Sequence, residues 1–232
     1  MSITEAIIRV RERMENACVR SGRSCAEVRL CAVSKFHGVS AVEEAYDAGQ
    51  RLFGENRVQE ASDKFTGFKT ARPGTHVHLI GSLQRNKAKA AVRLFDCIQS
   101  IDRDALIDEL GKLMQERNGS PALAVLLEMH TAENSKSGFP DTDALCRAAE
   151  KVLSYPAIRL SGLMTMAPFT DDEKAIRRAF KTVVSARTML EARFPGHWEC
   201  LSMGMSNDFE IAIEEGATLI RIGTAIFGSR AA

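Results

Sequence analysis

Short apolar segments alternate with longer amphipathic segments along the whole chain, and few folds accommodate that pattern. Residues 122–130 (ALAVLLEMH) are typical of a buried strand, and residues 141–153 after them are typical of a helix. The same alternation predicts strands at residues 30–33, 51–55, 76–83, 97–101, 122–130, 159–166, 199–205 and 219–227. Strands that alternate with helices favour a parallel sheet covered by helices.

Eight uninterrupted units of this kind predict a closed (β/α)8 barrel, the TIM barrel, in preference to an open sheet. The chain ends five residues after Phe227, which leaves too little sequence for an eighth outer helix. The capping box of Ser2 and Glu5 indicates an additional N-terminal helix, which is expected to occupy the position of the eighth outer helix. The alternative is an open doubly wound sheet, but no G-x-G-x-x-G follows the first strand. We find no linker, and predict one domain over residues 1–232.

Composition excludes several classes of function. The 31 Lys and Arg residues nearly balance 30 Asp and Glu residues, so the chain lacks the broad basic field that drives nonspecific nucleic-acid binding, although a small local anion site stays possible. Six cysteines without a C-x-x-C pair argue against a zinc site or a disulfide framework. No apolar run approaches the roughly 18 residues of a membrane span, and the N-terminus lacks a secretory signal. The expected compartment is therefore the cytoplasm.

Candidate functional residues stand where strands end, because barrels of this kind carry their chemistry at the C-terminal ends of the strands. Lys35 closes the first strand, either as a solvated lysine or as an inward amine that forms a Schiff base with a carbonyl. Ser206 follows the seventh strand, either as a helix N-cap or as a phosphate ligand at a helix start. Gly223 and Thr224 follow the eighth strand, and glycine lets a ligand approach the backbone closely.

Arg221 lies within the eighth expected strand and shares a face with Gly223, because side chains alternate across a strand. An unpaired arginine inside a barrel would be costly. Two explanations remain open at this point. A carboxylate such as Glu55 or Glu128 satisfies the guanidinium, or a ligand does.

Barrel closure places strands seven, eight and one side by side, over a span of about 10 Å. A flat phosphorylated aldehyde fits across that span. Its phosphate would meet Ser206, Gly223 and Thr224, its ring would pass near Arg221, and its aldehyde would reach Lys35. Pyridoxal 5'-phosphate (PLP) has this shape and this chemistry.

Several long motifs then occur in order along the chain: AVSKFHGVSAVEEAYDAGQRLFGENRVQEASDK, HLIGSLQRNKAK, ENSKSGF, LSGLMTM and LSMGMSNDFEIAIEEGATLIRIGTAIFG. Together they resemble the PLP homeostasis protein family, whose members are single-barrel PLP-binding proteins related to the N-terminal domain of alanine racemase. The resemblance covers residues from about 29 to 228, nearly the whole chain.

The resemblance implies that Lys35 carries PLP and that Arg221 faces the pyridine nitrogen. The other implied cofactor contacts are the phosphate ligands Ser206, Gly223 and Thr224 and the ring-lining residues Asn56 and Met203. Without the resemblance, Asn56 reads as an N-cap paired with Gln59, and Met203 reads as a core filler. Two further residues of these motifs, His37 and Lys136, are left out of the implied set.

The resemblance implies a non-catalytic PLP carrier in vitamin B6 homeostasis. The alternative is an amino-acid racemase on the same barrel, which needs a base on each face of the cofactor. Lys35 supplies one base, but Tyr46 is expected on an outer helix and Tyr155 at the opposite end of the barrel. The second base of racemases is a tyrosine from a C-terminal β domain, for which this sequence has no counterpart after its eighth strand.

An arginine at the pyridine nitrogen also weakens the cofactor as an electron sink. A Schiff-base aldolase without PLP ranks last, because it would need neither Arg221 nor a phosphate site. The expected partners are PLP and PLP-dependent apo-enzymes, and the absence of a coiled-coil pattern favours a monomer.

Overall fold

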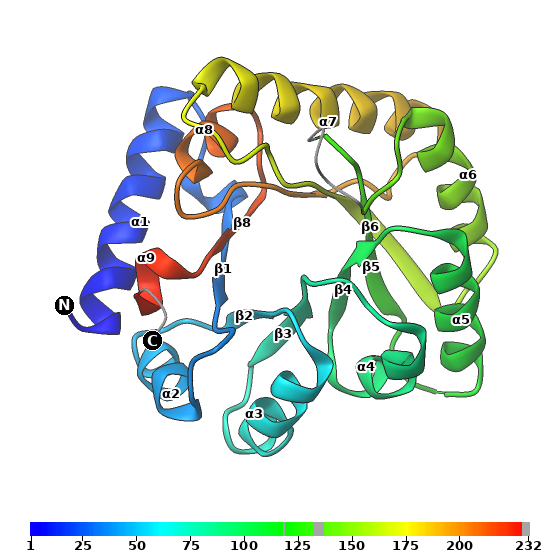
Figure 1. Ribbon diagram of the computed structural model, residues 1–232, viewed down its shortest axis with the longest axis horizontal. Helices are drawn as coiled ribbons and strands as arrows, with labels where there is room; N and C mark the ends of the chain where they lie inside the picture. Colours follow the sequence, from blue (N-terminus) through cyan, green and yellow to red (C-terminus); the bar gives the residue numbers. More distant parts are fainter. Residues whose placement is uncertain (118, 132–136, 229–232) are drawn as a thin grey trace.

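A computed structural model describes residues 1–117, 119–131 and 137–228 and contains a closed barrel of parallel strands in sequence order (Figure 1). The strands are β1 (Arg29–Val33), β2 (Leu52–Glu55), β3 (His76–Leu79), β4 (Cys97–Ile101), β5 (Leu123–Glu128), β6 (Ile158–Met164), β7 (Cys200–Ser202) and β8 (Leu219–Ile222). β1 pairs with both β2 and β8, which closes the barrel. The predicted TIM barrel is confirmed.

Helices surround the barrel on its outer side (Figure 1). They are α1 (Ile3–Arg20), α2 (Val39–Asp47), α3 (Val58–Ala71), α4 (Ala88–Leu94), α5 (Asp104–Gln115), α6 (Thr142–Leu153), α7 (Glu173–Arg193), α8 (Phe209–Glu214) and α9 (Thr224–Phe227). Two short 3-10 helices, Cys25–Glu27 and Arg85–Lys87, precede β1 and α4. No helix among the described residues has the length and apolarity that a membrane crossing requires.

The N-terminal helix α1 occupies the eighth outer position, as predicted, and contacts α2, α8 and α9 (Figure 1). Its capping box forms, because Ser2 Oγ accepts the Glu5 N–H and the Glu5 carboxylate accepts the Ser2 N–H. Ile7, Val10 and Met14 on its inner face are buried. Each such side chain contributes about 1.5–3 kcal/mol when fully buried, so packing on the barrel holds α1 in place.

Several predicted element boundaries are wrong. The third and seventh strands are shorter than predicted, since β3 ends at Leu79 and β7 ends at Ser202. Residues 224–227 form the short helix α9 instead of the end of the last strand, because the chain leaves the barrel at Gly223. Helix α2 begins at Val39 after Gly38, so Ser40, whose side chain is typical of N-caps, lies inside the helix.

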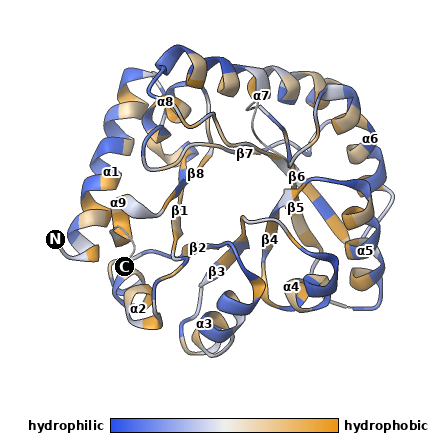
Figure 2. Ribbon diagram, viewed as in Figure 1, coloured by the Kyte–Doolittle hydropathy of each residue, from blue (hydrophilic) through white to orange (hydrophobic). Residues whose placement is uncertain are grey.

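Two layers of buried side chains result from the alternation along the strands. Large apolar residues such as Phe53, Phe65 and Phe209 fill the space between the barrel and the helices. The helices accordingly combine hydrophobic and hydrophilic residues in Figure 2. A second, smaller cluster of buried side chains combines the free cysteines Cys31 and Cys200 with larger residues such as Leu126 and Met164. Burial raises the pKa of the Cys31 thiol to about 12, so this thiol stays protonated.

Candidate functional site

Barrel closure brings the end of β8 against the end of β1, where Lys35 lies two residues after the strand. Cys31 is opposite Arg221 in this pair, and Ala32 is opposite Ile222. A Cβ atom on Gly223 would lie 3.3 Å from the Val33 carbonyl oxygen. The absence of a side chain at Gly223 therefore keeps the β8 backbone close to the chain that leads into Lys35.

Lys35 is half-buried, and the residue after it adopts an unusual backbone conformation. Phe36 has φ = 68°, which costs a non-glycine residue about 1–2 kcal/mol. The Glu60 carboxylate on α3 accepts the Phe36 N–H and stabilises this turn. His37 stacks on Phe227 with ring centroids 5.2 Å apart, which ties the same turn to α9. The turn that presents Lys35 is thus held from two sides.

A buried ionic network lies directly behind the Lys35 turn, between β1, β2 and α3. Lys64 Nζ donates to the Ser34 carbonyl oxygen at 2.7 Å and to Glu55 Oε1 at 2.7 Å. It also reaches Glu60 Oε1 at 3.2 Å. Lys64 therefore joins the backbone beside Lys35 to the carboxylate that holds the Phe36 turn.

Glu55 is completely buried in this network, and burial raises its pKa despite the hydrogen bonds from Lys64 and Ser34. Its Oε2 atom has no hydrogen-bond partner among the described residues. Of the two carboxylates suggested for Arg221, Glu55 is thus committed to Lys64, and Glu128 Oε1 accepts a hydrogen bond from Ser137 at 2.7 Å.

Arg221 is buried inside the barrel with neutral partners. Its Nη1 donates to Ser202 Oγ at 2.7 Å, and its Nη2 donates to the Thr165 carbonyl oxygen at 2.7 Å. Within the described residues no carboxylate oxygen lies within 4.0 Å of its nitrogens. The carboxylate explanation is therefore wrong for the described part of the chain. A ligand contact for Arg221 stays a prediction.

Ser206 lies in the loop after β7 and is not a helix N-cap. Helix α8 begins at Phe209 after the cap Asp208, whose carboxylate accepts the Met205 N–H and closes a turn. Gly204 has φ = +95°, and a Cβ atom there would lie 2.6 Å from the Ala212 Cβ atom. This turn therefore requires glycine before it reaches Ser206.

The expected phosphate ligands lie together at the β7 and β8 ends. Ser206 Oγ accepts the Ala225 N–H at 3.3 Å, which connects the β7 loop to the segment that contains Gly223 and Thr224. Ser206 and Gly223 are half-buried, and Thr224 is exposed. Two hydroxyl groups and a glycine backbone thus share one small area at the C-terminal end of the barrel.

Two expected ring contacts differ in their surroundings. Asn56 is half-buried after β2 and is not an N-cap, because α3 begins at Val58 after Arg57. Gly81 packs on it so closely that a Cβ atom there would lie 2.4 Å from the Asn56 carbonyl oxygen. Met203 is fully buried in the main hydrophobic core, so the structure shows a packing role for it. Its contact with a ring stays a prediction. Lys136 lies outside the described residues.

Three polar residues that the sequence pattern did not single out, Ser202, Gln99 and His78, continue from Arg221 through the barrel. Ser202 Oγ donates to Gln99 Oε1 at 2.6 Å, and Gln99 Nε2 contacts His78 Nδ1 at 2.8 Å. Alternation along β7 places Ser202 on the same face as Cys200, inside the barrel. This alternation is the sequence feature that could have identified Ser202. The hydrogen bonds join strands across the barrel, so no local sequence pattern could predict them.

The relatives of this chain agree with the geometry of its candidate site. Residues 10–231 match the model of the family described as alanine racemase, N-terminal domain. The pyridoxal phosphate homeostasis protein of Escherichia coli K12 is 42% identical over 98% of this chain and 97% of its own length. The chain belongs to the pyridoxal phosphate homeostasis protein family. The predicted resemblance is confirmed.

Other members of the family are similarly close. The pyridoxal phosphate homeostasis protein of Aquifex aeolicus VF5 is 36% identical over 99% of both chains. The structure of PipY from Synechococcus elongatus PCC7942, solved with PLP bound, is 36% identical with a TM-score of 0.81. The match covers 94% of this chain and 100% of PipY.

Proposed function

We propose that this protein binds PLP at the C-terminal end of its barrel and acts as a non-catalytic carrier in PLP homeostasis. The names of its relatives and the PLP-bound PipY structure support the ligand. The observation that carries the proposal is the buried guanidinium of Arg221, whose hydrogen-bond partners among the described residues are both neutral.

The chemistry of the residues fits the three parts of PLP. The Lys35 amine would hold the aldehyde carbon of PLP as a Schiff base, whose C=N bond forms with release of one water molecule. Ser206 and Thr224 offer hydroxyl donors to the phosphate, and Gly223 leaves room for it. The Arg221 guanidinium donates to the pyridine nitrogen, which keeps that nitrogen unprotonated. Asn56 and Met203 complete the proposed set beside the ring.

The positions of the tyrosines favour a carrier over a racemase. Tyr46 on α2 donates its hydroxyl to the Pro73 carbonyl oxygen at 2.8 Å. Tyr155, between α6 and β6, donates to Asp108 Oδ1 at 3.1 Å. Both hydroxyl groups lie away from the strand ends that present Lys35, so neither supplies the second base. We further propose that PLP-dependent apo-enzymes receive PLP from this protein, that it is a monomer, and that it acts in the cytoplasm.

Replacing Ser206 by alanine tests the phosphate site. The variant Ser206→Ala should bind PLP about 1.5–3 kcal/mol more weakly, which is the range for a hydrogen bond to a charged group. Binding of pyridoxal, which lacks the phosphate, should hardly change. Fluorescence or absorbance titration of both ligands measures the difference.

The matched control is Ser40→Ala, which removes a hydroxyl from an exposed position on α2. It should leave both affinities unchanged. Equal losses of PLP and pyridoxal affinity in Ser206→Ala would refute the assignment of Ser206 to the phosphate.

A further inference from the structure

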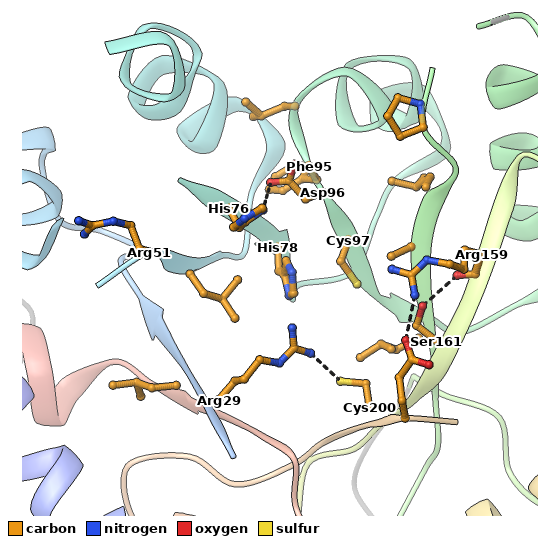
Figure 3. Close-up of a pocket in the computed structure, with 18 of the residues that line it drawn as sticks. Arg29, Arg51, His76, His78, Phe95, Asp96, Cys97, Arg159, Ser161 and Cys200 are labelled. Carbon is orange, nitrogen blue, oxygen red and sulfur yellow. Dashed lines mark hydrogen bonds and ion pairs between the residues drawn. The ribbon is translucent and has the colours of Figure 1, made fainter. Parts of the chain in front are cut away.

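The opposite end of the barrel contains a cavity that shares none of its lining residues with the proposed PLP site. Its volume is about 870 Å³, and it lies at the N-terminal ends of the strands, where β1, β3, β4, β6 and β7 begin (Figure 3). Seven Arg and Lys residues line it, against three Asp and Glu residues. Apolar side chains such as Leu52, Phe95 and Leu126 form other parts of its wall.

The carboxylates of this cavity are largely neutralised by neighbouring cations. Lys69 binds Asp96 at 2.8 Å, and Arg159 binds Glu199 at 2.9 Å. Arg29 differs, because its nearest hydrogen-bond partner in the described chain is the thiol of Cys200, at 3.8 Å. Burial raises the pKa of that thiol, so the partner is neutral. The charge of Arg29 is thus available to an anion.

His78 points into the same cavity toward Arg29 (Figure 3). Only 8% of its surface is exposed, and burial lowers its pKa to about 3, so the ring is neutral at pH 7. Gln99 Nε2 can only donate, so His78 Nδ1 accepts and the ring proton sits on Nε2. The described residues provide no acceptor for this Nε2–H. It is a nearly buried donor that faces a cationic cavity.

Three consecutive hydrogen bonds, each donated from the Arg221 side toward His78, connect His78 to Arg221. Arg221 donates to Ser202 at 2.7 Å, Ser202 donates to Gln99 at 2.6 Å, and Gln99 donates to His78 at 2.8 Å. All of these side chains are buried in the barrel interior. An acceptor at His78 Nε2 would polarise each bond in turn and strengthen the hold of Ser202 on Arg221.

We propose that the N-terminal cavity is a second ligand site for an oxyanion of the phosphate type, held by Arg29 and His78 and linked through Gln99 and Ser202 to Arg221. The oxyanion comes either from free phosphate or from the phosphate group of a larger molecule whose apolar part lies on the cavity wall. The site itself is independent of the proposed function, whereas the link to the cofactor rests on it.

Titration calorimetry with inorganic phosphate at constant ionic strength tests the site on protein that has been saturated with PLP. One binding event per chain is expected, weakened at least tenfold in Arg29→Met and in His78→Phe. Arg29 is exposed, so its variant should fold even where His78→Phe does not. The control Arg9→Met removes the same charge from the exposed face of α1 and should change nothing.

Phenyl phosphate separates the two sources of the oxyanion. Tighter binding than that of inorganic phosphate indicates an organic phosphate, and equal or weaker binding indicates free phosphate. The site is overturned when no saturable heat appears, or when Arg9→Met weakens binding as much as Arg29→Met does. If the heat of phosphate binding persists in Ser206→Ala but disappears in Arg29→Met, the phosphate binds in this cavity and not at the proposed PLP phosphate site.

The link is tested by the absorbance of the bound cofactor during the phosphate titration. The spectrum should change in the wild-type protein and stay constant in Gln99→Leu, which interrupts the hydrogen bonds between the two sites. Phosphate binding without any spectral change in the wild-type protein would overturn the link. Failure of the protein to bind PLP would instead overturn the proposed function, while calorimetry on PLP-free protein still reports on the cavity.

Discussion

Replacing Lys64 by methionine is expected to lower the free energy of unfolding by about 3–5 kcal/mol, the usual cost of removing one partner from a buried ion pair. Lys64 and Glu55 are both buried, with 2.7 Å between Nζ and Oε1. Without Lys64, the Glu55 carboxylate would keep only the hydrogen bond from Ser34. Urea denaturation at pH 7 measures the loss.

The size of this loss should depend on pH. Burial already raises the pKa of Glu55 in the native protein, and loss of Lys64 removes its charge and its hydrogen bond, the two largest effects that oppose this shift. A carboxyl whose pKa is higher in the folded than in the unfolded state stabilises the fold when it is protonated. The deficit of Lys64→Met should therefore be largest at neutral pH and shrink as the pH falls toward the ordinary carboxyl pKa of 4.5.

Two controls isolate the buried charge. The double variant Lys64→Met/Glu55→Leu removes both charges and should recover most of the lost stability. Lys69→Met, on the same helix, breaks a half-exposed pair with Asp96 and should cost no more than about 1 kcal/mol. Similar losses in Lys64→Met and Lys69→Met would show that the buried network contributes little.

The PLP-loaded protein is expected to exchange the α-proton of L-alanine at least about 100-fold more slowly than an enzyme that turns over at 1 s⁻¹. The reason is that neither tyrosine of the chain is placed as a second base, because Tyr46 and Tyr155 donate their hydroxyl groups to Pro73 and Asp108. Proton NMR in deuterated water follows the reaction directly.

The tyrosines also provide the control for this experiment. Tyr46→Phe and Tyr155→Phe should leave any residual rate unchanged. Exchange at an enzyme-like rate that is lost in Lys35→Ala would mean that another group acts as the second base. The racemase alternative would then be correct.

The barrel could be predicted from the sequence because its signal is local and repeated. Segments such as residues 122–130 and 141–153 each carry their own periodicity, and the order of the units leaves few topologies. Residues 224–227 were wrongly assigned to the last strand, because four residues are too few to show the period that separates a strand from a helix.

The loops of the site were harder to predict, because tertiary contacts decide where their helices begin. Ser40 and Ser206 have the side chains of N-caps, yet α2 begins one residue before Ser40 and α8 three residues after Ser206. Asp208 closes a turn onto the Met205 N–H instead, and Ser206 receives the Ala225 N–H. Local capping motifs cannot include such contacts.

The partners of Arg221 were also beyond local inference. Alternation correctly placed Arg221 inside the barrel, where an unsatisfied charge needs an explanation. The acceptors belong to Ser202 on β7 and Thr165 after β6, and barrel closure alone decides which interior groups meet. Lys64 had a weaker signal, since it shares a helix face with the buried Ala61 and Phe68.

Borohydride reduction of the PLP-loaded protein, followed by peptide mass spectrometry, tests the central proposal most directly. Reduction converts the C=N bond into a stable C–N bond and so marks the lysine that holds the cofactor. The proposal predicts a pyridoxyl adduct on Lys35, at one adduct per chain, and its disappearance from that peptide in Lys35→Ala. An adduct found mainly on Lys87, Lys89 or Lys136 would contradict it.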